Sequence, residues 1–363
     1  MSQRLLACVV GLMALGRPLA GQPRPSMLRL IDSVRVAESD TFLLTRPTRL
    51  VVGPRGHYFV ADSREARIIE LQANGRLVRR IGRNGAGPGE LRRPSSVAIA
   101  GDSLLSVWDA GNQRVVTWDL RTLDVRATFP LKGWFPQLRY DRGGLTVGVL
   151  SADASEPPLH FLAPDGTRLG SAGVVPSAFR AAPPLVGGFG VVTSADDGDD
   201  TYAVFEVENA LYHWKRGLGS ADVTTIPLRE RRGVRPELFQ EMLRNPEKAG
   251  PIAYDRSLVV ALQRLGQGIL GFVTMDGQLE KGTNFVGTMR LTVLDVARRR
   301  ACVDMSIPAL PDPLPAVAFS GDTLVVLQGG ETSSGDAATF ITRYHVGTAR
   351  CPWVNLPRAT PAR

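Results

Sequence analysis

An internal repeat of 47 residues, four short apolar runs in each copy, and a chain of 363 residues without an internal linker together predict an all-β fold. A four-stranded unit exposes both of its faces and cannot be stable alone, so such units stack radially and bury those faces against each other. The sequence therefore predicts a six-bladed β-propeller of four-stranded antiparallel blades, with one short helical insertion.

The N-terminal residues have the organisation of a secretory signal peptide. Arg4 supplies a positive charge, an apolar run extends from Leu5 to Leu15, and small residues precede a polar, proline-rich stretch. The apolar run is too short to span a bilayer, and no other segment reaches the ~20 apolar residues of a membrane helix. We expect residues 1–21 to be a signal peptide and residues 22–363 to form one propeller domain, secreted or periplasmic.

The repeat is clearest between two segments that begin at Pro47 and Pro94. The aligned positions, each offset by 47 residues, are Val60–Ser63 with Val107–Ala110 and Arg67–Ile69 with Arg114–Val116. The apolar runs of the first unit are Leu50–Val52, Tyr58–Ala61, Ile68–Leu71 and Leu77–Ile81. Turn residues separate these runs, as between antiparallel strands, and Asn74-Gly75 suits a hairpin turn that needs positive φ.

The first two units also share an ordered set of motifs. Gly82–Leu91 is a glycine-rich approach to Pro94, Val107–Asp109 ends a strand in aspartate, and Asn112–Val115 leads into the next strand. This order resembles the NHL-repeat family over residues 47 to about 130. The resemblance implies a bacterial, secreted six-bladed propeller, in which the strand-end aspartate serves the geometry of the blade.

Four further units follow with the same rhythm of strands and turns. The third runs from about Gln137 to Gly173 and the fourth from Leu185 to Leu228, and the fifth and sixth contain strands near Ile269–Thr274 and Thr323–Leu327. Leu28–Val36 precedes the first unit and can supply the strand that closes the ring with the last. Five or seven blades remain as alternatives to six.

One stretch between the fourth and fifth units breaks this rhythm. Residues 236–244 have helical spacing, with a proline at the start and Asn245-Pro246 at the end. Its basic approach contains our candidates for ligand or partner binding: Arg229, Arg231, Arg232 and Arg235. Guanidinium groups pair bidentately with carboxylates and phosphates, so these residues predict an anion or peptide site. The alternative is a solvated basic loop.

Two cysteines remain once the leader is removed, Cys302 and Cys351. An even pair in an oxidising compartment favours a disulfide. Both follow similar strand ends, so they can occupy equivalent places on neighbouring blades. Equivalent outer positions would lie beyond the ~7 Å limit between Cα atoms. Pairing and non-pairing both stay open on the sequence alone.

Several other patterns have a structural and a functional interpretation. Gly82–Gly89 lacks the Gly-Lys-Ser/Thr ending of a phosphate loop and precedes a strand, so we interpret it as a blade-to-blade connection. Asp196–Asp200 can be a calcium loop or a solvated hairpin turn, and its spacing is not that of an EF-hand. Asp62, Asp109 and Asn112 near strand ends can serve a lactonase-like calcium site, but blade geometry is the favoured role. The four histidines, His57, His160, His213 and His345, have no metal-ligand spacing.

These patterns favour a non-catalytic module that binds a protein, peptide or small-molecule ligand over a calcium-dependent lactonase-like or lyase-like enzyme. No cofactor is expected, with calcium as the open alternative, and catalytic residues are unassigned. The net charge falls from +8 to +6 when the leader is lost, and the basic residues are dispersed with few aromatics. We therefore expect no nucleic-acid partner, no membrane span and a monomer.

Overall fold

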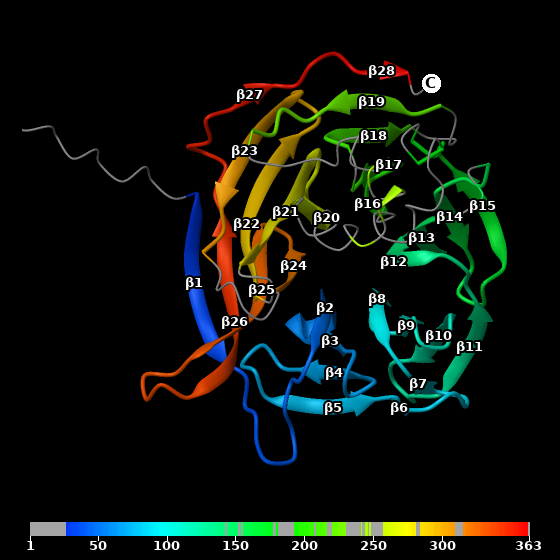
Figure 1. Ribbon diagram of the computed structural model, residues 1–363, viewed down its shortest axis with the longest axis vertical. Helices are drawn as coiled ribbons and strands as arrows, with labels where there is room; N and C mark the ends of the chain where they lie inside the picture. Colours follow the sequence, from blue (N-terminus) through cyan, green and yellow to red (C-terminus); the bar gives the residue numbers. More distant parts are fainter. Residues whose placement is uncertain are drawn as a thin grey trace, which may run out of the picture.

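The computed structural model describes residues 27–361, apart from residues 142–143, 152, 154, 177–178, 181–191, 207, 216–219, 230–240, 242–243, 246, 248–256, 281–283 and 309–314. These residues form six antiparallel sheets, arranged as a ring around one axis (Figure 1). The predicted six-bladed propeller is confirmed. In the described parts of the chain, no helix is long and apolar enough to cross a membrane.

The first three blades each contain four strands in sequence order from the axis outward. Blade 1 is β2 (Pro47–Val52), β3 (Tyr58–Asp62), β4 (Arg67–Leu71) and β5 (Leu77–Ile81). Blade 2 is β8 (Pro94–Ala100), β9 (Leu104–Asp109), β10 (Arg114–Asp119) and β11 (Val125–Pro130). Blade 3 is β12 (Trp134–Asp141), β13 (Gly144–Leu150), β14 (Leu159–Leu162) and β15 (Arg168–Ala172).

The other three blades each include a strand from a chain terminus. Blade 4 is β16 (Val192–Asp197), β17 (Asp200–Phe205), β18 (Ala210–Trp214) and β19 (Asp222–Thr225), with β28 (Thr360–Pro361) outside. Blade 5 is β20 (Ser257–Gly266), β21 (Ile269–Glu280), β22 (Asn284–Asp295) and β23 (Arg300–Ser306), with β27 (Val354–Asn355) outside. Blade 6 is β24 (Ala316–Ser320), β25 (Thr323–Glu331) and β26 (Ala337–Val346), closed by β1 (Leu28–Arg35). The N-terminal strand therefore closes the ring, as expected.

The hydrophobic core lies between neighbouring blades, because successive residues of a strand point to opposite faces. On β3, Tyr58 and Val60 pack toward blade 6, whereas Phe59 and Ala61 pack toward blade 2. All four side chains are buried. Both faces of each sheet are covered, which explains why these strands are almost continuously apolar.

The glycine-rich run is a blade-to-blade connection, as interpreted. Its ends form two short parallel strands, β6 (Arg83–Asn84) and β7 (Glu90–Leu91). The Glu90 carboxylate accepts hydrogen bonds from the Gly87 backbone N–H at 2.7 Å and from the Arg83 side chain at 2.9 Å. These contacts keep the run folded on itself.

Asp62 and Asp109 hold the connections at the ends of their strands. Both are fully buried. Asp62 accepts from the backbone N–H groups of four residues, Thr45, Arg46, Arg64 and Glu65, at 2.7–3.2 Å. Asp109 accepts from the N–H groups of Arg92 and Arg93 and from the Asn112 side chain. The blade-geometry interpretation of these aspartates is correct.

We expect Asp62→Ala to lower the free energy of unfolding by about 3 kcal/mol, because several buried N–H groups would lose a charged acceptor. Chemical denaturation measures the change. Asp102→Ala, in an exposed turn, is the matched control and should change stability by less than about 0.5 kcal/mol. Equal effects of the two substitutions would contradict the anchoring role of Asp62.

The C-terminal tail runs back around the outside of the ring after β26 (Figure 1). It adds β27 to the outer edge of blade 5 and β28 to the outer edge of blade 4. Between them, the Leu356 N–H donates to the Arg299 carbonyl oxygen at 2.8 Å. The guanidinium of Arg300 stacks on the Trp353 ring at 4.2 Å. The tail therefore covers two strand edges that would otherwise be unpaired.

Candidate functional site: the central channel

The innermost strands of all six blades line a cavity on the propeller axis. Its volume is about 180 Å³, and residues of β2, β8, β12, β16, β20 and β24 surround it. Its polar side chains come from four of these strands: Arg49, Gln137, Arg139, Tyr140, Thr193, Ser194 and Gln263. We call this cavity the channel site.

Arg49 is a cation in the channel site without an acidic partner among the described residues. Its Nη1 donates across the channel to the carbonyl oxygen of Val260 on blade 5, at 3.3 Å. Burial lowers the pKa of Arg49 to about 10. A partly buried charge without a counter-charge costs free energy, and an anion in the cavity would recover part of that cost.

Arg139 lies between two carboxylates from adjacent blades. Its Nη1 donates to Asp141 Oδ2 at 2.9 Å and to Asp196 Oδ2. Hydroxyl groups also donate to these carboxylates, Thr146 to Asp141 and Thr201 to Asp196 at 2.7 Å. The Nε and Nη2 atoms of Arg139 are buried and have no hydrogen-bond partner. Arg139 therefore joins blades 3 and 4 through Nη1, while its other two nitrogens make no hydrogen bond.

The two carboxyl groups are hydrogen-bonded to each other and titrate as a pair. Burial, and then the neighbouring Asp196, raise the pKa of Asp141 to about 6. Burial alone would raise the pKa of Asp196 as well, but the hydrogen bond with Asp141 and the charge of Arg139 lower it. Asp141 is therefore the member of the pair that holds the shared proton.

Replacing Asp141 with Asn should remove a pH dependence of stability. The folded protein binds the extra proton with a pKa above the unfolded value, so wild-type stability falls as the pH rises from about 4 through about 6. Asp141→Asn should be nearly as stable as wild type at pH 4 and about 2 kcal/mol more stable at pH 7.5. Denaturant titrations across this range measure the difference. Asp124→Asn, on an exposed turn, is the control, and parallel pH profiles of Asp141→Asn and wild type would refute the assignment.

Thr193 adds a hydroxyl group without a partner. The residue is only 4% exposed, it lines the channel site, and its Oγ1 is buried with no hydrogen bond. A buried polar atom of this kind needs a partner to offset its loss of water. Among these groups, the Arg49 guanidinium suits the recognition of a small acidic molecule, and Arg139 and Thr193 line the same cavity.

Of the arginines selected from sequence, Arg229 is not among the residues that line the channel site. Arg231, Arg232 and Arg235, and most of the expected helix at 236–244, fall outside the described residues. Arg229 is exposed, and its backbone N–H donates to Asp304 Oδ2 on blade 5 at 2.8 Å. The signal-peptide residues 1–21 also lie outside the described part of the chain.

The aspartates at 196–200 lie on a tight hairpin, and their described side chains pair with different residues. Asp196 and Asp197 belong to β16, because a two-residue turn with Gly198 at φ +62° joins them to β17. Asp197 pairs with Arg264 at 3.1 Å, and Asp200 pairs with His213 at 3.0 Å. Over the described residues, no group of three His, Cys, Asp or Glu side chains is placed to hold a metal ion.

The four histidines lie on different blades. His57 pairs with Glu70 at 2.7 Å, His213 with Asp200 and His345 with Asp322 at 3.2 Å. His160 is buried in blade 3, where burial lowers its pKa. They do not converge on the axis. His57, His213 and His345 fit the expected surface or hydrogen-bonded strand positions, whereas His160 is buried.

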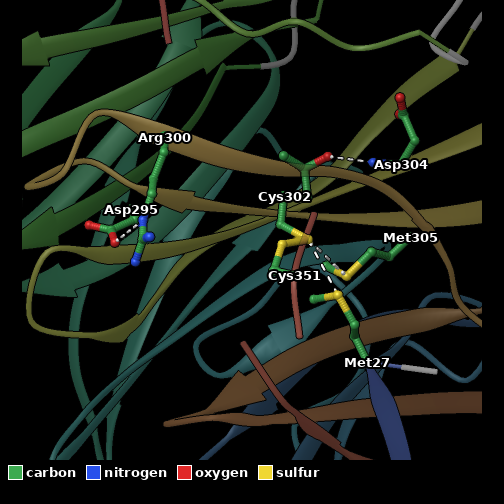
Figure 2. The surroundings of a disulfide bond; sticks show 8 residues. Met27, Asp295, Arg300, Cys302, Asp304, Met305 and Cys351 are labelled. Carbon is green, nitrogen blue, oxygen red and sulfur yellow. Dashed lines mark hydrogen bonds and ion pairs between the residues drawn. A yellow bond between two sulfur atoms is a disulfide. The ribbon is translucent and has the colours of Figure 1, made fainter. Parts of the chain in front are cut away.

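Cys302 and Cys351 are joined in a disulfide with Cα atoms 5.8 Å apart. Figure 2 shows the sulfurs of Met27 and Met305 gathered around it. The two cysteines are not at equivalent positions of neighbouring blades. Cys302 lies on β23, whereas Cys351 lies in the tail beyond β26, where the chain has turned back over blade 5. The disulfide therefore fastens the tail to the blade that it covers.

The channel residues Arg49, Arg139 and Thr193 were missed by sequence reasoning. Each lies on the innermost strand of its unit. An alignment of all six units would be needed to identify these strands from sequence, but the later units share only the order of strands and turns, so no such alignment can be made.

Residues 26–145 match the family DUF5128, described as a 6-bladed beta-propeller. The match spans blades 1 and 2 and reaches into blade 3. The chain is a six-bladed propeller. No curated protein matches its sequence.

Solved structures share the propeller fold at low sequence identity. A DUF4221 family member from Bacteroides vulgatus has a TM-score of 0.58 and 8% identity, over 87% of this chain and 97% of that one. A protein from Bacteroides fragilis, named as an expected exported protein, has a TM-score of 0.55 and 11% identity, over 87% and 95%. The WD40 repeats of RRP9 have a TM-score of 0.54 and 13% identity, over 88% and 100%. At these identities the likeness concerns the fold alone.

Proposed function

We propose that this propeller is an exported binding protein that holds a small carboxylate in its channel site. The observation that carries this proposal is Arg49, a partly buried guanidinium whose only hydrogen bond among the described residues goes to a backbone carbonyl. A guanidinium presents parallel N–H groups that match the two oxygens of a carboxylate. Thr193 and Arg139 line the same cavity.

The size of the cavity limits the ligand. A volume of about 180 Å³ is close to the ~150 Å³ of an engineered cavity that accommodates benzene. The ligand is therefore a compact acid of roughly ten non-hydrogen atoms or fewer. In this proposal the site binds the ligand and does not catalyse a reaction. The apolar lining side chains, such as Val97 and Val317, would contact its hydrocarbon part.

Export rests on the signal-peptide pattern of residues 1–21 and on the disulfide, since disulfides persist in oxidising compartments. The repeat units are NHL-like in the first third of the chain. The Arg-rich segment from Arg229 to Arg235 would give such a protein a second, peptide-binding surface.

Calorimetry with acetate, succinate and benzoate, and with their uncharged amides, tests the carboxylate site. The acids should bind the wild type and raise its melting temperature, whereas the amides should not. Arg49→Gln should weaken binding at least tenfold, because the charged partner is lost. The control, Arg64→Gln, changes an exposed loop arginine. Equal binding by both variants, or binding of none of the three acids, would overturn the proposal.

A further inference from the structure

A second cavity lies where blade 1 meets blade 2, and it shares no lining residue with the channel site. Its volume is about 410 Å³. The charged residues around it are Arg55, His57, Glu70, Arg79, Asp102 and Arg121. We call it the interblade pocket.

Glu70 organises the floor of the interblade pocket. Its carboxylate is buried and contacts His57 Nδ1 at 2.7 Å through one oxygen and Arg79 Nε through the other. Arg79 Nη2 also donates to the carbonyl oxygen of Leu120 on blade 2, at 2.8 Å. Because an ionised carboxylate only accepts, His57 Nδ1 carries a proton, and the second ring nitrogen, Nε2, lies on the opposite side from Glu70.

A four-stranded blade can fold without the His57–Glu70 contact. The repeat places Leu104 at the position of His57 and Thr117 at the position of Glu70, 47 residues further along the chain. Thr117 is hydrogen-bonded to Ser106 at 2.6 Å, within blade 2. Blade 2 therefore folds with an apolar residue and a hydroxyl where blade 1 has a buried ionic group. The buried Glu70 carboxylate and its contact with His57 are therefore particular to blade 1 and are not part of the repeat.

The charges of the interblade pocket favour an anionic ligand. One oxygen of Glu70 is paired with the Arg79 guanidinium and the other accepts a hydrogen bond from His57, so this carboxylate does not repel an incoming anion with its full charge. Arg55 and Arg121 are exposed at the rim, with no ion pair among the described residues. Asp102 is the one other acid of the lining. Cationic groups thus outnumber acidic groups around the cavity.

Apolar side chains form part of the same wall. Phe59 and Leu120 are buried beneath the interblade pocket, and Val78 is 40% exposed beside it. An isolated inorganic ion would not use this surface. A small organic molecule could place its hydrocarbon part here and its charged group against the arginines.

We propose that the interblade pocket binds a small organic molecule through a phosphate group. The cations approach from blade 1 and blade 2, as a tetrahedral dianion with several acceptor oxygens requires. The remaining Arg79 nitrogen, Nη1, contacts the phosphate from the floor beside the His57 ring, and Arg55 and Arg121 contact it from the rim. This site is independent of the carboxylate proposed for the channel site.

Calorimetry with phenyl phosphate on the full mature chain tests the site, with inorganic phosphate and benzoate as the other probes. The measurements use an Arg49→Gln background, so that the channel site contributes no heat. We expect phenyl phosphate to bind more tightly than inorganic phosphate, and benzoate to bind most weakly. Arg121→Gln should weaken binding by roughly tenfold, as expected for loss of one charge-assisted contact.

Arg92→Gln is the matched control, because Arg92 is exposed on a different connection and does not line the interblade pocket. Proton NMR adds a readout at the site, since the chain has four histidines and His57→Gln identifies the His57 ring signal. Saturable movement of that signal with phenyl phosphate supports the proposal. An unmoved His57 signal, or equal loss of binding in Arg121→Gln and Arg92→Gln, overturns it. Neither outcome depends on whether the channel site binds a carboxylate.

Discussion

Replacing Arg139 with Met should lower the free energy of unfolding by about 3–5 kcal/mol at pH 8. Asp141 and Asp196 come from adjacent blades and share this one guanidinium. Without it, two half-buried carboxylates are left side by side with no cation. The methionine occupies a similar volume, so the change tests charge more than packing.

The pH dependence of this loss identifies its cause. Removing the cation favours the protonated forms of both acids, so the destabilisation should be smaller at pH 5 than at pH 8. Adding Asp196→Asn to Arg139→Met should restore part of the stability at pH 8, because one of the opposing charges is removed. Denaturant unfolding of the single and double variants measures both effects.

Arg126→Met is the control for Arg139→Met. Arg126 also pairs with an aspartate, Asp119 at 2.6 Å, but its side chain is 54% exposed on an outer strand. An exposed pair of this kind contributes less than about 1 kcal/mol. A loss of that size for Arg139→Met, or a loss that is the same at pH 5 and pH 8, would contradict the role given to Arg139.

Removal of the disulfide should lower the free energy of unfolding by about 4 kcal/mol. Cys302 and Cys351 are 49 residues apart, and the chain-entropy relation gives this magnitude for a loop of that length. The double variant Cys302→Ser/Cys351→Ser should also release the tail from blades 5 and 4. Limited proteolysis should then cleave residues 347–361 faster than in the wild type.

Reduction of the wild type provides the matched comparison. A reducing agent should bring the wild type to the stability of the double variant and leave the double variant unchanged. Equal stability of oxidised wild type and double variant, with the tail equally protected from protease, would show that strands β27 and β28 hold the tail without the disulfide.

The two proposed sites lie at the two kinds of surface that a propeller creates. The channel site forms where innermost strands converge on the axis, and the interblade pocket forms where two sheets meet near an edge. Both use arginines that would be costly to bury in an ordinary core. Rigid strands position these side chains, which favours preorganised binding.

The sequence by itself determined the repeating unit, its four strands and the closure of the ring by residues 28–36. The unit and its strands are local features, since alternation along a strand and turn residues such as Asn74-Gly75 act over a few positions. The closing strand was expected from its place before the first unit, although its pairing with residues 340–346 is long-range. The role of Asp62 in blade geometry was expected from the resemblance to NHL repeats, and the same strand-end aspartate recurs 47 residues later at Asp109. A two-residue turn shortened the expected loop at 196–200, which placed Asp196 and Asp197 within a strand.

Only the tertiary structure decided which residues meet. Arg49 and Arg139 lie on blades 1 and 3, and they line one cavity because ring closure brings the innermost strands to a common axis. Their orientation depends on strand register, and a one-residue shift would turn each side chain to the other face. The path of the tail, and with it the pairing of Cys302 with Cys351, depends on contacts between segments distant in sequence. No local pattern contains that information.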